Sequence, residues 1–284
     1  MSHITMCRPT FFNVTRRSLT NRMMNPDNPP RRGLATNQWW ALRESFRRHG
    51  LVVDIMEGQP GLEDMTFVAN AGLPVRGHFV LSNFLEEERR GEKEHNRNYF
   101  ERVYGSGRVL SLSDEAIFEG QGDALFLDEN TLLIGYGVRT NKRAVEEISS
   151  IVYGLDPNIV VVPLLFNPIN HYPPYENIFY HLDTCLLSLR DVDRIIIHSD
   201  TFSGEAIRAL EKLGRGIISV TKEDADLFVC NSVVFDKVVF TPKIKGSRVR
   251  NLLVSMGYTV EENDMSEFMK SGGAVKGLSL GMNG

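Results

Sequence analysis

Cysteines are scarce in this 284-residue sequence, and long apolar runs are missing. The three cysteines, Cys7, Cys185 and Cys230, are odd in number and widely spaced, which predicts neither a disulfide framework nor a zinc site. No apolar stretch approaches the roughly 20 residues that a membrane-spanning helix needs. The opening segment MSHITMCRPTFFNV lacks the basic and then apolar pattern of a signal peptide. We therefore expect a cytoplasmic protein with no membrane partner.

An excess of positive charge is also lacking. The chain has 32 Lys and Arg against 36 Asp and Glu, a formal net charge of −4. General nucleic-acid binders depend on a basic surface that contacts phosphates, so we expect no nucleic-acid partner. A hydrophobic content of 42% is typical of a globular protein with a sizeable core. A homo-oligomer remains open, because an apolar helix face has the same pattern in an interface and in a core.

One pattern recurs five times along the chain. An amphipathic, helix-like stretch is closed by a glycine, and a short β-branched run and a motif with an acidic residue follow. Repeats of about 50 residues indicate repeated supersecondary units that bury their faces against each other. The sequence therefore predicts an α/β fold, a single domain over 1–284, with five modules closed into a ring around a pseudo-fivefold axis. The closing glycines are Gly50, Gly107, Gly154, Gly214 and Gly257.

The alternative is an ordinary α/β domain whose alternation of helices and strands repeats by chance. Against it, every copy carries an acid at a corresponding place, and in a closed ring we expect these acids to converge near the central axis. They are Asp64, Glu119, Asp183, Asp224 and Glu267.

Two of these motifs read as strands with a polar face. In IFEGQGDALFL, Glu119, Gln121 and Asp123 are two residues apart and would share one face. In FYHLDTCLLSL, His181 and Asp183 have the same spacing, and a histidine beside a carboxylate is a ready general acid or base. A surface strand or a structural histidine is the alternative for each motif taken alone. The apolar flanks favour buried carboxylates, which need a partner or a cationic ligand.

Two arginines, Arg89 and Arg139, follow strand-like runs in the second and third copies. An isolated arginine is normally a surface residue. Two arginines near a set of acids would suit a zwitterionic ligand, with carboxylates at its cationic end and arginines at its carboxylate. A divalent metal held by the acids would leave the arginines unexplained, so we expect no metal.

Six strings, in order along the chain, together resemble the guanidino-group-modifying enzymes of the pentein fold. They are MCRPTFFNV, DMTFVANAGL, FEGQGDAL, GYGVRT, FYHLDTCL and SEFMKSGGAVKGLSL. This superfamily includes arginine deiminase, arginine dihydrolase, dimethylarginine dimethylaminohydrolase and the amidinotransferases. DMTFVANAGL is most similar to the dimethylaminohydrolase-like and dihydrolase branch. The resemblance implies a pentein fold and a small guanidino substrate such as arginine, with no cofactor.

The resemblance also implies a mechanism. In that superfamily a cysteine attacks the guanidinium carbon to form a thiouronium intermediate, and a histidine protonates the leaving nitrogen and then activates water. His181 matches this histidine, and Glu119 matches the acid that orients it. The cysteine's position, after the glycine-rich segment KSGG, is occupied by Gly277. Ser279, which we expect on the same strand face, is a much poorer nucleophile without a dedicated base.

Further residues match the groups that hold substrate in the superfamily. Asp64 and Asp183 match the carboxylates that bind the guanidinium, while Arg89 and Arg139 match the groups that bind the substrate's carboxylate. Asn70 lies in the segment that, in the dihydrolase branch, helps to decide how far hydrolysis proceeds. Asn21, in LTNRMM, matches a second asparagine near the site, although the superfamily pattern there is closer to INPWM.

Several interpretations of function remain open. Full hydrolysis of arginine to ornithine competes with deimination to citrulline, demethylation of methylarginines and amidino transfer to an amine. The absence of the nucleophile has two explanations. The chain is either a deliberately inactivated variant that binds substrate without turnover, or a natural pseudoenzyme that binds a guanidino compound. The other matched positions are intact, which favours the first explanation.

Overall fold

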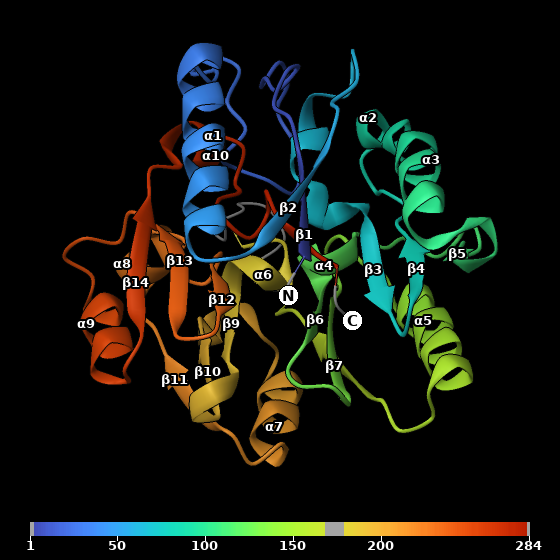
Figure 1. The fold of residues 1–284 in the computed structure, drawn as a ribbon. Helices are drawn as coiled ribbons and strands as arrows, with labels where there is room; N and C mark the ends of the chain where they lie inside the picture. Colours follow the sequence, from blue (N-terminus) through green and yellow to red (C-terminus); the bar gives the residue numbers. More distant parts are fainter. Residues whose placement is uncertain (1–2, 168–178, 283–284) are drawn as a thin grey trace.

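Five small sheets surround the centre of the molecule, and five longer helices lie outside them (Figure 1). The computed structural model describes residues 3–167 and 179–282. Each sheet has three strands, which in hydrogen-bonded order are β15 (Leu280–Gly281), β1 (His3–Cys7), β2 (Val52–Met56); β3 (Gly72–Val75), β4 (His78–Leu81), β5 (Val109–Leu110); β6 (Ala124–Phe126), β7 (Thr131–Tyr136), β8 (Val160–Leu165); β9 (Leu186–Leu189), β10 (Arg194–Ile197), β11 (Gly216–Ser219); β12 (Val233–Phe235), β13 (Val238–Pro242), β14 (Thr259–Asn263).

The five sheets share one connectivity. The first strand of each pairs antiparallel with the middle strand, and the middle strand pairs parallel with the third. A parallel pair needs a crossover connection, and in each module a helix supplies it. The predicted α/β fold of five repeated modules is confirmed, and each module has the order ββαβ. The crossover helices are α1 (Arg32–Arg48), α3 (Glu92–Tyr104, preceded by α2, Glu87–Arg90), α5 (Lys142–Leu155), α7 (Gly204–Lys212) and α9 (Arg248–Ser255).

The two ends of the described chain close the ring. Strand β15 pairs with β1 through Ile4 opposite Gly281 and Thr5 opposite Leu280, whereas β1 pairs with β2 over five positions. Figure 1 shows the N and C marks close together near the centre. The last module is therefore built from both ends of the sequence. Among the described residues, no helix combines the length and the apolar character needed to cross a membrane.

Helix α5 shows how the sequence produces these elements. Asn141 caps it, its side chain accepting a hydrogen bond from the Ala144 N–H. Ala144, Val145, Ile148 and Val152 form a buried stripe with the helical period. Gly154 lies inside this helix and is not the predicted cap.

The other closing glycines follow the prediction with one exception. Gly50, Gly214 and Gly257 have left-handed backbones, with φ of 86°, 73° and 85°. After α3 the residue with positive φ is Gly105, at 92°, and not Gly107.

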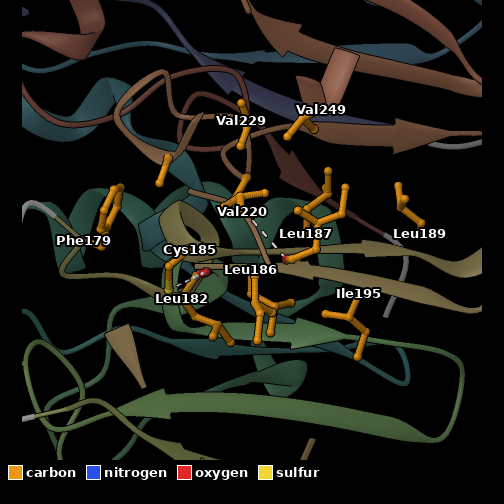
Figure 2. Packing of buried hydrophobic residues seen from close by; sticks show 14 of the residues in the cluster. Phe179, Leu182, Cys185, Leu186, Leu187, Leu189, Ile195, Val220, Val229 and Val249 are labelled. Carbon is orange, nitrogen blue, oxygen red and sulfur yellow. Dashed lines mark hydrogen bonds between the residues drawn. The ribbon is translucent and has the colours of Figure 1, made fainter. Parts of the chain in front are cut away.

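The largest apolar cluster packs around β9 and β10. Figure 2 shows Cys185 in this cluster beside Leu182 and Leu186. The cysteine is fully buried, and its thiol donates to the carbonyl of His181 at 3.5 Å. Cys185 is a core residue.

The strand interpretation of the two polar motifs was wrong. Residues Gly120–Asp123 form the short helix α4, and Leu182–Cys185 form α6, so β6 and β9 begin only afterwards. Glu119 and Gln121 consequently point to different partners, His181 and the Gly281 carbonyl. The backbone is helical and not extended at this point, where it packs against the backbone of residues 69–72. Gly120 has φ of 57°, and a Cβ on it would lie 2.7 Å from the Ala69 carbonyl oxygen.

Two of the five repeated acids do not approach the centre. Asp224 accepts hydrogen bonds from Ser247 at 2.7 Å and from Arg248 at 3.0 Å. Glu267 accepts from the Arg31 N–H and forms an ion pair with Lys270, both at 2.7 Å. Both acids lie on short helices at the start of their motifs and tie neighbouring segments together. Within residues 3–167 and 179–282, the other short helices are η1 (Glu63–Thr66), η2 (Val68–Ala71), η3 (Ser106–Arg108), η5 (Arg190–Val192), η6 (Ser199–Thr201), α8 (Lys222–Asp226) and α10 (Ser266–Met269).

Candidate functional site

A small polar cavity collects most of the residues singled out from the sequence. Its volume is about 20 Å³, close to the space of a single water molecule. Glu119 is not part of the wall and lies directly behind it, bonded to His181. The lining residues are Arg16, Asn21, Met24, Asp64, Phe67, Asn70, Glu86, Arg89, Arg139, Tyr180, His181, Asp183, Thr184, Asn231, Ser271, Gly272, Gly273 and Gly277.

His181 and Glu119 form a buried pair, with Nε2 2.8 Å from Oε2. Burial opposes ionisation of Glu119, but the charge of Arg139 and the contact with His181 outweigh it and hold the pKa of Glu119 well below its usual range. An ionised carboxylate only accepts hydrogen bonds. The proton of this bond therefore belongs to His181 Nε2.

Burial lowers the pKa of His181 to about 4, and Glu119 opposes this shift. At neutral pH the ring is therefore uncharged. Because Nε2 carries the proton, Nδ1 is the basic nitrogen. Of the two residues, His181 is the one that lines the cavity.

Arg139 holds the other side of Glu119. Its Nη1 donates to both carboxylate oxygens, at 3.1 and 3.2 Å, and its Nε donates to Thr20 Oγ1 at 2.6 Å. The guanidinium lies over the ring of Tyr180, 4.9 Å from its centroid. Arg139 therefore contacts the Glu119 carboxylate of the His181–Glu119 pair directly.

Arg89 is bound in a similar way by a different acid. Its Nε and Nη2 donate to the two oxygens of Glu92 at 2.7 and 3.0 Å. Its Nη1 donates to Asn70 Oδ1 at 3.2 Å, and Asn70 in turn donates to the Glu119 carbonyl. Asn70 in η2 and Arg89 in α2 are thus connected to the backbone of Glu119.

Among the described residues, three carboxylates line the cavity: Asp64, Asp183 and Glu86. Asp64 accepts from Ser271 Oγ at 3.2 Å and is paired with Arg16 at 3.1 Å. Asp183 is buried, and burial raises its pKa while the charge of Lys276 opposes the rise. A cationic ligand beside Asp183 would stabilise its ionised form.

Asn21 anchors the N-terminal segment against the glycine-rich segment. Its side-chain amide donates to the Ser271 carbonyl at 2.9 Å and to the Tyr180 hydroxyl at 3.0 Å. Gly272 packs against it, because a Cβ there would lie 2.8 Å from Asn21 Oδ1. The uncertain sequence match of Asn21 thus corresponds to a residue that lines the cavity.

Gly277 differs from the glycines that precede it. Gly272 has φ of 73°, and a Cβ on Gly273 would collide with the Phe67 ring at 2.4 Å. A Cβ on Gly277 would meet only Phe67, at 3.3 Å, and atoms at 3.7 Å, and its φ lies outside the left-handed region. A side chain at residue 277 therefore needs only a small shift of the Phe67 ring.

Ser279 and the three cysteines lie away from the cavity or are held in the core. Ser279 lies in the turn before β15 and not on the predicted strand, and its hydroxyl donates to the Val275 carbonyl at 2.8 Å. Burial raises the pKa of Cys7, Cys185 and Cys230. Within residues 3–167 and 179–282, no cysteine lines the cavity. The same residues contain no group of three or more His, Cys, Asp or Glu placed to hold a metal.

Sequence reasoning missed Asn231 and Arg16. Asn231 Oδ1 accepts from the N–H groups of Ala274 and Gly277, at 2.8 and 3.1 Å, and its Nδ2 donates to the Asp183 carbonyl at 3.3 Å. Asn231 lies two residues before β12 and lines the cavity. The search for an acid selected Asp224 instead. Arg16 lies in a doublet, Arg16–Arg17, that nothing in its sequence pattern marks.

The profile of one protein family, N,N dimethylarginine dimethylhydrolase, eukaryotic, matches residues 12–276. The chain belongs to this family. The N(G),N(G)-dimethylarginine dimethylaminohydrolase of Mycobacterium tuberculosis is 32% identical, over 97% of this chain and 84% of that protein. Protein ZK1307.1 of Caenorhabditis elegans, uncharacterised, is 34% identical over 87% of this chain and 82% of its own length.

Arginine dihydrolases of cyanobacteria are also similar. AgrE of Nostoc, a bifunctional arginine dihydrolase/ornithine cyclodeaminase, is 32% identical over 97% of this chain, which spans only 37% of AgrE. The N-terminal domain of ArgZ, in a variant with one cysteine replaced by serine and bound to substrate, superimposes with a TM-score of 0.87. That match has 30% identity and covers 100% of this chain and 98% of the domain. AgrE with one cysteine replaced by alanine, in complex with L-arginine, has a TM-score of 0.88, with 30% identity, and covers 100% of this chain and 40% of that one. The fold is that of the pentein proteins.

Proposed function

We propose that this chain binds arginine or a close derivative in the site of a guanidino-group hydrolase and lacks the nucleophile of that hydrolase. Because the cavity of about 20 Å³ has room for about one water molecule, binding requires its lining side chains to move apart. One observation carries the proposal: Gly277 and His181, which is bonded to Glu119, border one cavity that Asp64 and Asp183 also line. The backbone of Gly277 is not left-handed, and a Cβ there requires only that the Phe67 ring move by a few tenths of an ångström. The parent activity is hydrolysis of a guanidino C–N bond.

The carboxylates recognise the planar cation. Asp64 and Asp183 accept hydrogen bonds from the guanidinium nitrogens, and the charge of the ligand favours the ionised form of Asp183. His181 holds a proton on Nε2 against Glu119, which leaves Nδ1 as the basic nitrogen of the ring. With a cysteine at 277, the ring would take the thiol proton and pass it to the departing nitrogen. With glycine there, binding occurs without a covalent step.

The arginines bind the far end of the ligand. Arg139 and Arg89 each hold a protein carboxylate, so they reach a ligand carboxylate by sharing N–H groups with Glu119 and Glu92. Arg16 also lines the cavity, and its side chain is 20% exposed. We include Arg16 with the two predicted arginines in this role.

The cyanobacterial relatives support binding without the nucleophile. An AgrE variant without one of its cysteines is found with L-arginine, and a comparable ArgZ variant is found with substrate. Removal of a cysteine leaves those proteins able to bind. The same outcome is expected for a chain that carries glycine at 277.

The experiment restores the side chain. Gly277→Cys should hydrolyse L-arginine or a methylated arginine, with ornithine, citrulline, ammonia and methylamines measured as products. The unmodified chain should bind the same compound in calorimetric titration and release no product. Gly277→Ala is the matched control, because its Cβ occupies the same position without a thiol.

Each failure has a distinct meaning. If neither protein binds any guanidino compound, the proposed ligand class is wrong. If Gly277→Cys binds as the unmodified chain does and produces nothing, the chain is a binding protein and not an enzyme that has lost one group.

A further inference from the structure

One buried unit behind the cavity wall joins the two members of the acid/base pair. Asp123 and Thr140 are 0% and 1% exposed, and Thr140 Oγ1 donates to Asp123 Oδ2 at 2.7 Å. Neither residue lines the cavity. Their remaining hydrogen bonds go to the backbone beside Glu119 and beside His181.

Thr140 fixes the backbone of Glu119. Its Oγ1 accepts from the Glu119 N–H at 3.3 Å, while the preceding residue, Arg139, binds the Glu119 carboxylate. Asn141 extends the contact, donating through its N–H to the Ile117 carbonyl at 3.0 Å. Three consecutive residues before α5 thus hold the segment that carries Glu119.

Asp123 fixes the backbone after His181. Its Oδ1 accepts from the Leu182 N–H at 3.1 Å, at the point where α6 begins. That N–H is one of those that a helix start leaves without an intrahelical partner. The Asp123 carboxylate therefore sets the direction in which His181 leaves the chain.

We propose that Thr140 and Asp123 are positioning residues that hold Glu119 and His181 in register as a single unit. Burial raises the pKa of Asp123, and the hydrogen bonds from Thr140 and Leu182 oppose that rise. A buried, hydrogen-bonded carboxylate of this kind is costly to disturb. The unit links three segments, and a shift in any one of them would lengthen the 2.8 Å contact between His181 and Glu119. This inference rests on the proposed function only for its kinetic test.

The first test needs no activity. Nuclear magnetic resonance of the unmodified chain should show the His181 Nε2–H as a hydrogen-bonded proton protected from exchange. Thr140→Val, which removes the hydroxyl and keeps the shape, should abolish this resonance. Thr140→Ser should retain it. The control is Thr241→Val, because Thr241 is equally buried, in β13, and its hydroxyl has no hydrogen-bond partner among the described residues.

Asp123→Asn provides a second variant if Thr140→Val does not fold. An asparagine keeps an acceptor for the Leu182 N–H but turns a donor toward Thr140, so the resonance should again be lost. Persistence of the resonance in a folded Thr140→Val or Asp123→Asn protein overturns the proposal.

The kinetic test uses the Gly277→Cys background. Adding Thr140→Val should lower kcat by about 10- to 100-fold, because small displacements of catalytic groups have effects of that size. KM should change little, and Thr140→Ser should recover most of kcat. If Gly277→Cys has no turnover, the proposed function fails while the resonance test still decides the positioning role. An unchanged kcat in Thr140→Val overturns the positioning role.

Discussion

His181 gives the protein a stability that depends on pH. The pKa of the imidazole is 6.5 in its ordinary state and about 4 in the folded chain, lowered by burial. Between these values the unfolded chain binds more protons than the folded one, so stability rises with pH across this window. As the pH falls from about 6.5 to about 4, this single group should remove about 3 kcal/mol of stability.

The measurement is urea unfolding at several pH values between about 4.5 and 6.5, within the window that the two pKa values of His181 define. Asp183, whose pKa burial raises, contributes with the opposite sign, so the comparison with His181→Gln isolates the histidine. Glutamine can still donate to Glu119 but does not titrate in this range. Relative to the variant, the unmodified chain should lose stability as the pH falls through this window. Parallel curves would show that His181 titrates normally.

At the level of single residues, the sequence predicted which side chains are buried better than it predicted their hydrogen-bond partners. The apolar flanks of Glu119 and His181 indicated burial, and both are buried, 2.8 Å apart. The sequence did not reveal that Arg139 and Arg89 already bind protein carboxylates, Glu119 and Glu92. Those contacts depend on the three-dimensional fold. The sequence shows the charge of an arginine but not the carboxylate with which it pairs.

At the level of elements, Asn231, just before β12, links the glycine-rich segment to helix α6. One side chain satisfies two N–H groups of that segment and the Asp183 carbonyl. Asn231→Leu leaves these buried groups without partners, and each costs about 1–3 kcal/mol. We expect a loss of about 2–5 kcal/mol in total.

The matched control is the next residue. Ser232 is also buried, but its hydroxyl makes a single bond, to the Val229 carbonyl at 2.8 Å. Ser232→Ala should cost about 1 kcal/mol, the net contribution of one such bond. Urea unfolding gives both values. Equal costs for the two variants would contradict the role of Asn231.

The elements that sequence patterns missed are the short helices. A period of two is expected of a strand, and Glu119, Gln121 and Asp123 have that spacing, yet Gly120–Asp123 is helical. The cause is non-local, because the backbone at 69–72 lies against Gly120. Long amphipathic helices such as α5 were predicted because their pattern is set by one face against the core.

At the scale of the whole molecule, folding and ligand binding should depend on the order of the modules around the ring and not on where the chain begins and ends. Strands β15 and β1 are antiparallel neighbours, so a short Gly/Ser linker can join residue 282 to residue 3. New ends can be placed between Pro60 and Gly61, which are exposed and lie between modules. This circular permutant should fold and bind the same guanidino compound.

Circular dichroism and calorimetric titration check the permutant. Its control is a chain without residues 1–7, which loses β1 and with it the partner of both β15 and β2. The truncated chain should lose binding although none of the lining residues is removed. An unfolded permutant would show that the native connection between β2 and η1 is required.

The junction between β15 and β1 also has a mechanical consequence. It has two paired positions, against five between β1 and β2. Tension applied to the two chain ends would load this junction as a zipper, one hydrogen bond after another, while the other sheets stay unloaded. Gly277 lies three residues before β15, so the first segment to peel away in an optical trap would carry one wall of the cavity with it. Ligand binding should therefore raise the force at which the first extension step occurs.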